Sequence, residues 1–110
     1  MENRKDMKML FIVVNEDFAY EVLDIAFEAG LTGATILNAR GETVKDQSIM
    51  GITVDTGKEI ILSIADEAKA EKAMLAIKEK AGIKTPAHAF CFTMPIDKIV
   101  GLSIAPENEE

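Results

Sequence analysis

The sequence predicts an α+β domain in which a strand–helix–strand unit occurs twice. Three observations predict this class. Apolar runs of strand length alternate with amphipathic helical segments. Each helical segment starts after a residue that can cap a helix and ends at a glycine, and the two helical segments are nearly equal in length. A chain of 110 residues is long enough for one such domain and not for two.

The first unit begins with residues 7–14 (MKMLFIVV), which are apolar and rich in β-branched side chains and therefore predict a buried strand. Asn15 follows and is predicted to cap the first helix, because its side chain can accept from the free N–H groups of a helix start. Gly30 is predicted to end that helix, and residues 35–37 begin the second strand. The helix carries apolar residues at helical spacing: Phe18, Val22, Ile25 and Ala29.

The second unit repeats this order. Residues 59–65 (EIILSIA) predict a strand, Asp66 is predicted to cap the second helix, and Gly82 is predicted to end it. Residues 89–94 (AFCFTM) predict a last strand that closes at Pro95. The apolar face of the second helix is predicted to hold Ala70, Ala73, Met74, Ile77 and Ala81.

Two such units in succession predict the ferredoxin-like βαββαβ fold, a four-stranded antiparallel sheet with both helices on one face. The strands are apolar nearly throughout, so the face without helices would expose a large apolar patch, which soluble monomers avoid. We therefore predict that this face packs against other copies of the chain. Residues 1–110 are predicted to form a single domain, with flexible tails at residues 1–6 and 106–110.

Composition excludes several classes of function. The formal net charge of −7 argues against nucleic acid as a partner, because phosphate backbones attract basic surfaces. Cys91 is the single cysteine, which excludes an internal disulfide and a cysteine-rich zinc site and fits a cytoplasmic location. The apolar run of residues 9–14 is too short for membrane insertion. No pair of carboxylates is placed for acid–base catalysis, so we expect no enzyme activity and no catalytic residue.

Three stretches resemble the PII nitrogen-regulatory family and its PII-like relatives. They are GATILNARG (residues 33–41), EIILSIADEAKAEKAMLAI (residues 59–77) and FCFTMPIDKIVGL (residues 90–102). The resemblance implies a homotrimer whose sheets face inward and which binds a small effector, typically an adenine nucleotide, between subunits. It also implies that residues 39–57 form a T-loop-like excursion that regulates a partner protein, such as a transporter or an enzyme.

The resemblance places a ligand cleft between the root of this excursion and the loop before the last strand. It implies these ligand-binding residues: Arg40, Gly41, Glu42, Thr43, Lys84, Thr85 and His88. The partner-docking residues would be Val44, Lys45, Ile49 and Met50. Each has a plainer interpretation: Arg40 as a surface or inter-subunit ion-pair partner, Lys84 and Thr85 as part of a solvated link, and His88 as a satisfied surface side chain. No spacing indicates a metal site.

The sequence departs from the family where the family holds phosphates. The segment before the last strand has no glycine after Gly82, and Pro86 lacks an N–H donor. Gly101 and Ser103 stand where the family has two arginines. These departures argue against ATP sensing in the family's manner, although the resemblance implies ATP, ADP, AMP or another small anion as the effector and no cofactor is certain. Two alternatives remain, a trimer of the divalent-cation-tolerance type and a structural or interaction trimer that binds no nucleotide.

Overall fold

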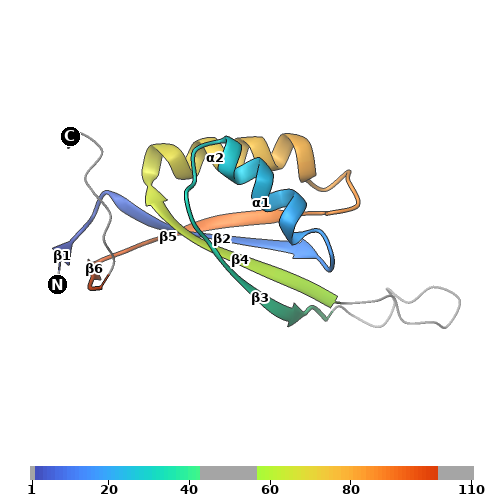
Figure 1. The fold of residues 1–110 in the computed structure, drawn as a ribbon, viewed down its shortest axis with the longest axis horizontal. Coiled ribbons are helices and arrows are strands. Elements are labelled where there is room, and N and C mark those ends of the chain that lie inside the picture. Colours follow the sequence, from blue (N-terminus) through green and yellow to red (C-terminus); the bar gives the residue numbers. More distant parts are fainter. Residues whose placement is uncertain (1, 43–56, 102–110) are drawn as a thin grey trace, which may run out of the picture.

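A computed structural model describes residues 2–42 and 57–101 of the chain (Figure 1). The predicted partner-docking residues and Thr43 lie outside this part. No helix of the described part is long and apolar enough to cross a membrane. The elements are β1 (Glu2–Asn3), β2 (Met7–Asn15), α1 (Ala19–Glu28), β3 (Thr35–Arg40), β4 (Gly57–Asp66), α2 (Glu67–Ala81), β5 (Phe90–Pro95) and β6 (Lys98–Ile99).

Four of these strands form one sheet in the order β3-β4-β2-β5, and every neighbouring pair is antiparallel. Both helices lie on the same face of this sheet (Figure 1). The predicted ferredoxin-like fold is therefore confirmed. The two central strands, β2 and β4, come from different halves of the chain, so the sheet joins the two strand–helix–strand units into one body.

The core lies between the sheet and the helices. Leu10, Ile12 and Val14 alternate along β2 with full burial, and Ile61 opposite Ile12 on β4 is also fully buried. Period-two alternation is what one covered face of a sheet requires. The helices contribute Ala19, Val22, Ala26, Ala73, Ile77 and Ala81 to the same cluster. The small alanines let both helices approach the sheet closely, which suits a core with few aromatic residues.

The opposite face of the sheet is apolar, and no helix of residues 2–42 or 57–101 lies over it. Phe11 on β2 is paired with Leu62 on β4 and with Phe92 on β5, and the rings of Phe11 and Phe92 stack with centroids 4.9 Å apart. Phe92 is nevertheless 41% exposed and its neighbour Phe90 is 57% exposed. The predicted uncovered apolar face is therefore confirmed. We call it the open face, and its residues are Met9, Phe11, Val13, Leu37, Ile60, Leu62, Ile64, Phe90, Phe92 and Met94.

Helix α2 begins and ends as predicted. The Asp66 side chain accepts a hydrogen bond of 2.9 Å from the Lys69 N–H, which is an N-cap contact. Gly82 follows the last helical residue, and a Cβ built on it would lie 2.5 Å from the Lys78 carbonyl oxygen. Only glycine fits there without a backbone shift, because two atoms cannot approach so closely.

Helix α1 ends as predicted but does not begin as predicted. At its end, Gly30 has φ +120°, the Gly30 N–H donates to the Phe27 carbonyl, and the Leu31 N–H donates to the Ala26 carbonyl. This pair of bonds is the Schellman motif, in which a glycine lets the chain turn away from the helix. At its start, Phe18 occupies the N-cap position and makes no side-chain cap bond. The prediction that Asn15 caps this helix is wrong.

The first residues of the chain form a short pair of strands. Glu2–Asn3 pairs antiparallel with Lys98–Ile99, although the sequence predicted a tail over residues 1–6. The Arg4 guanidinium donates two hydrogen bonds to the Asp6 carboxylate, at 3.1 and 3.0 Å, and this contact lowers the Asp6 pKa below its usual value. Whether either tail is flexible stays a prediction, and residues 106–110 lie outside the described part.

Candidate functional site

The candidate site lies at the end of the sheet where β2 and β3 stop and where β4 and β5 start (Figure 1). The ladder pairs Arg40 with Gly57, so the two arms of the excursion leave the sheet side by side. On the other side of β4, Lys58 pairs with Asn15. The segment that leads into β5 reaches the same end of the sheet. Loops far apart in sequence therefore meet here because antiparallel strand ends alternate along a sheet.

Asn15 is the centre of this site. Its backbone N–H donates to the Ala87 carbonyl at 2.9 Å, and its side-chain Nδ2 donates to the Pro86 carbonyl at 2.9 Å. Its Oδ1 accepts a hydrogen bond of 2.6 Å from the Lys58 ammonium. One amide side chain thus joins the loop before β5 to the arm of the excursion that returns into β4. This is why Asn15 does not cap α1, since both ends of its amide are already bonded.

Glu59 supplies the missing cap. Its Oε1 accepts hydrogen bonds from the backbone N–H groups of Asp17, at 2.9 Å, and Ala19, at 3.1 Å. A carboxylate at this position also faces the positive end of the helix dipole. The connection from β2 to α1 is tight enough that Asp17 takes φ +79°, a left-handed conformation that costs energy for a residue with a Cβ.

Both arms of the excursion pack closely at their roots. The Glu16 N–H donates to the Gly57 carbonyl at 3.1 Å, and a Cβ on Gly57 would lie 2.7 Å from the Glu16 carboxylate. A Cβ on Gly41 would lie 3.0 Å from Cε of Lys58. The Lys58 stem therefore lies across the departing arm while its ammonium reaches Asn15, so Lys58 contacts both the excursion root and β2. Small residues at both roots allow this close approach.

The loop before β5 is folded on itself. The Thr85 N–H and Oγ1 both donate to the Gly82 carbonyl, at 3.0 and 2.9 Å. His88 has φ +46°, its backbone N–H donates to the Thr85 carbonyl at 3.0 Å, and its Nδ1 lies 3.1 Å from the Ile83 carbonyl. A carbonyl can only accept, so Nδ1 carries a proton and donates it to the Ile83 carbonyl. Thr85 and His88 therefore stabilise the loop, and their contact with a ligand stays a prediction.

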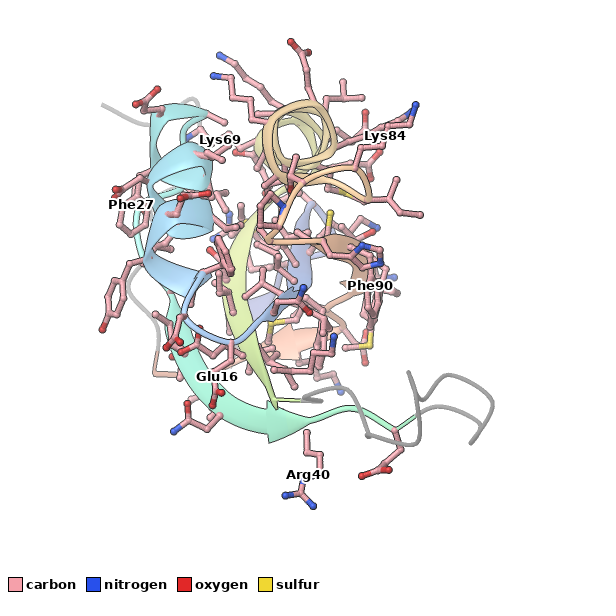
Figure 2. The ribbon with its side chains drawn as sticks, turned by 90° about the vertical axis from the view of Figure 1, so that its right-hand side faces the viewer. Glu16, Phe27, Arg40, Lys69, Lys84 and Phe90 are labelled. Atoms are coloured by element: carbon pink, nitrogen blue, oxygen red, sulfur yellow. The ribbon has the colours of Figure 1, made fainter. Side chains whose placement is uncertain are left out.

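The two predicted cations of the site lie on opposite edges of the sheet. Arg40 ends edge strand β3, and Lys84 precedes edge strand β5. Three strand spacings of about 4.8 Å separate these edges, which is about 14 Å in all. Figure 2 shows Arg40 pointing away from the sheet and Lys84 on the far side of the molecule. Both are exposed, as is Glu42. One chain therefore does not bring Arg40 and Lys84 to one ligand.

Asn15, Lys58 and Glu59 are site residues that the sequence prediction missed. A signal for them exists, because polar residues at the end of one strand and at the start of its antiparallel neighbour must meet across the ladder. Cys91 packs against the core, and burial raises the pKa of its thiol. Within residues 2–42 and 57–101, no group of three or more His, Cys, Asp or Glu side chains is placed to hold a metal ion.

No protein-family model and no curated protein matches the sequence. Two solved structures are similar in fold. One is described as a PII-like signalling protein from Thermus thermophilus; it is 19% identical, with a TM-score of 0.60, and the match covers 83% of this chain and 89% of that one. The other is CPII, a nitrogen regulatory PII-like protein from Thiomonas intermedia, in a structure bound to ADP, AMP and bicarbonate. It is 18% identical, with a TM-score of 0.62, and the match covers 89% of this chain and 96% of that one. The chain therefore has the fold of the PII-like signalling proteins, as the sequence resemblance implied.

Proposed function

We propose that the chain is a divergent PII-like signalling protein. It forms a homotrimer, binds a small anionic effector between subunits and regulates a partner protein through the excursion of residues 39–57. The observation that carries this proposal is the open face, because it gives the fold a surface for assembly and the loops of the candidate site lie at its end.

The open face favours assembly because its exposed aromatic and aliphatic side chains are continuous across all four strands of the sheet. Phe90, Phe92 and Met94 line one edge of it with exposures of 57%, 41% and 43%, and Leu37 on the opposite edge strand is 45% exposed. Burying a large apolar side chain contributes about 1.5–3 kcal/mol, so covering this face in every subunit stabilises an oligomer strongly. A ring of three inward-facing sheets covers all of it.

A ring also resolves the separation of Arg40 and Lys84. Cyclic assembly uses heterologous contacts, so one edge of a sheet meets the other edge of the next sheet. The β3 edge of one subunit then lies beside the β5 edge of its neighbour. Arg40 would face Lys84 of the partner subunit, with both residues at the loop end of their sheets. Each such cleft offers two cations to a ligand, although neither cation makes a hydrogen bond or ion pair with the described residues of its own chain.

The chemistry of the loop before β5 favours an effector of low charge. Pro86 has no N–H, and the N–H groups of Thr85 and His88 are used inside the loop, so few donors are left for a chain of phosphates. Two cations per cleft match a ligand with about one or two negative charges. We therefore propose a nucleoside monophosphate such as AMP, or a small oxyanion such as bicarbonate, in preference to ATP.

The first experiment measures the mass of the purified protein by size-exclusion chromatography with light scattering. We expect three times the mass of one chain. Phe92→Glu places a charge on the open face and should yield monomers, whereas Leu75→Glu alters a residue of α2 that is 66% exposed and lies on the opposite side of the molecule, and should stay trimeric. A monomeric wild-type protein would contradict the assembly.

The second experiment measures the melting temperature with AMP, ADP, ATP, bicarbonate and divalent metal ions. We expect AMP or bicarbonate to raise it most. Arg40→Met and Lys84→Met should each abolish the rise, and Lys72→Met, which removes an exposed charge from α2, should preserve it. A trimer that responds to no compound would be a structural trimer, and a response to metal ions alone would favour a protein of the divalent-cation-tolerance type.

A further inference from the structure

We propose that Asn15 is a coupling residue, whose side-chain amide transmits a displacement of the loop before β5 to the root of the excursion in the same subunit. The inference rests on the proposed function for what moves the loop and what the excursion does. The mechanical link itself is a property of the chain without ligand.

The loop before β5 is built to move as one body. Its internal hydrogen bonds run from Thr85 to Gly82, from His88 to Thr85 and from His88 to Ile83, all between 2.9 and 3.1 Å. The Thr85 hydroxyl and N–H share the Gly82 carbonyl, which ties the loop to the end of α2. A ligand that contacts one residue of this loop therefore displaces the whole loop rather than a single side chain.

Asn15 is where this body is attached to the sheet end. The Asn15 N–H donates to the Ala87 carbonyl and Asn15 Nδ2 donates to the Pro86 carbonyl, each at 2.9 Å. The two acceptors are adjacent carbonyls, so Asn15 is hydrogen-bonded to the middle of the loop. A displacement of these carbonyls pulls on the Asn15 amide directly, because N–H···O bonds weaken steeply with distance and angle.

The other end of the same amide holds Lys58. The bond from Nζ to Oδ1 is 2.6 Å, short as expected when the donor is charged. Lys58 is half-buried, and its stem lies 3.0 Å from where a Cβ on Gly41 would be. The Lys58 side chain thus packs against the departing arm of the excursion at Gly41. When the Asn15 amide rotates, the Lys58 ammonium must follow or lose its bond, and either event changes the packing of Lys58 against Gly41 at the root of the excursion.

The two contacts of the Asn15 side chain do not serve to cap α1, because Glu59 caps this helix. An amide meets both demands at once, because its Nδ2 donates to the Pro86 carbonyl while its Oδ1 accepts from the Lys58 ammonium. Asn15→Asp keeps the contact with Lys58 and loses the contact with Pro86. Lys58→Met removes the contact with Lys58 and keeps the contact between Asn15 and Pro86. These two substitutions therefore separate the halves of the link.

The test is hydrogen exchange of individual amides by NMR in the full chain without ligand. Lys58→Met should speed exchange of the distant Thr85 and His88 amides by roughly three- to tenfold, the effect of losing one ordinary hydrogen bond. In an Asn15→Asp background, which already breaks the Pro86 contact, Lys58→Met should add nothing at these amides. Lys72→Met removes an exposed charge from α2, away from Asn15 and from the proposed cleft, and should leave exchange at Thr85 and His88 unchanged.

A Lys58→Met protein whose Thr85 and His88 amides exchange as in the wild type would overturn the coupling. The coupling would also be overturned if Lys58→Met sped exchange at Thr85 and His88 equally in the wild-type and in the Asn15→Asp background. Neither outcome bears on trimer formation or on effector binding, which are measured separately, and a failure of the proposed function leaves this ligand-free result standing.

A second measurement uses AMP as the probe. In the wild type, AMP should slow exchange at residues 57–59, and in Asn15→Asp this effect should vanish at AMP concentrations that saturate the protein, because the coupling free energy between the two sites is lost. An Asn15→Asp protein that loses AMP binding outright would assign Asn15 to the ligand contact and overturn its role as a coupling residue. If the wild type binds no AMP, the proposed effector is wrong, and the ligand-free exchange experiment decides the coupling.

Discussion

The two junctions from strand to helix look alike in sequence and differ in structure. Each strand ends at an Asx residue followed by glutamate, Asn15–Glu16 after β2 and Asp66–Glu67 after β4. Asp66 caps the helix that it precedes, through a bond of 2.9 Å. Asn15 has the same opportunity but bonds to Pro86 and Lys58 instead. The capping contact of the second junction is local, although Glu67 also donates its N–H to the Asp6 carbonyl at 3.1 Å and its carboxylate lies 3.6 Å from the Lys8 ammonium. At the first junction the Asx side chain itself joins separate segments of the chain.

The first junction lacks the local helix cap that the second junction has. Helix α2 starts directly after its cap, but three residues intervene before α1, and one of them, Asp17, has a left-handed backbone. The cap comes from Glu59, on a strand of the other half of the chain. Proteins depart from local rules mainly where a site requires it, so the irregular junction supports the proposal that the site lies at this end of the sheet.

The largest expected effect comes from removing the distant cap. Glu59→Ala should lower the free energy of unfolding by about 2 kcal/mol, because two backbone N–H groups lose their acceptor and the helix dipole loses its counter-charge. Urea denaturation at fixed protein concentration measures this. The control is Glu21→Ala, which removes an exposed acid from the first turn of the same helix and should cost less than about 0.5 kcal/mol. Equal losses in the two variants would mean that Glu59 is no cap.

The contrast between the junctions also explains what the sequence could predict. The strands, α2 and its ends, and the open apolar face follow from periodicity and from residues next to one another, and all of these are confirmed. The pairing of residues 2–3 with residues 98–99 was not predicted, because two-residue strands carry no period. Strand order and register decide such contacts, and one sequence gives neither directly.

The same limit applies to the site. Asn15 bonds to Pro86 across 71 positions and to Lys58 across 43, so no local pattern announces either contact. The predicted cations, Arg40 and Lys84, were chosen by resemblance, and the fold of one chain separates them on opposite sheet edges. Their meeting depends on a second subunit, which is a property of assembly and not of local sequence.

A smaller effect is expected at the local junction. Asp66→Ala should cost about 1 kcal/mol, the usual loss for an N-cap, and Asp66→Asn should be nearly neutral because asparagine caps equally well. The same urea measurement applies, with Glu71→Ala, which removes an exposed acid from the same helix, as the control. A large loss in Asp66→Asn would show that the charge matters more than the capping bond. Such a result would make this junction less local than its hydrogen bonds indicate.

The smallest effect is expected from one substitution made at both junctions, with opposite signs. Asp17→Gly should raise the free energy of unfolding by about 0.5 kcal/mol, because glycine adopts φ +79° without strain and this gain exceeds the added freedom of the unfolded chain. Asp66→Gly should lower the free energy of unfolding by a few tenths of a kcal/mol, because it removes a capping side chain from an ordinary extended backbone. Parallel thermal and urea unfolding of the two variants gives the comparison. A loss of stability in Asp17→Gly would mean that the aspartate side chain stabilises the turn by more than its backbone strain costs, and the first junction would then be irregular without being strained.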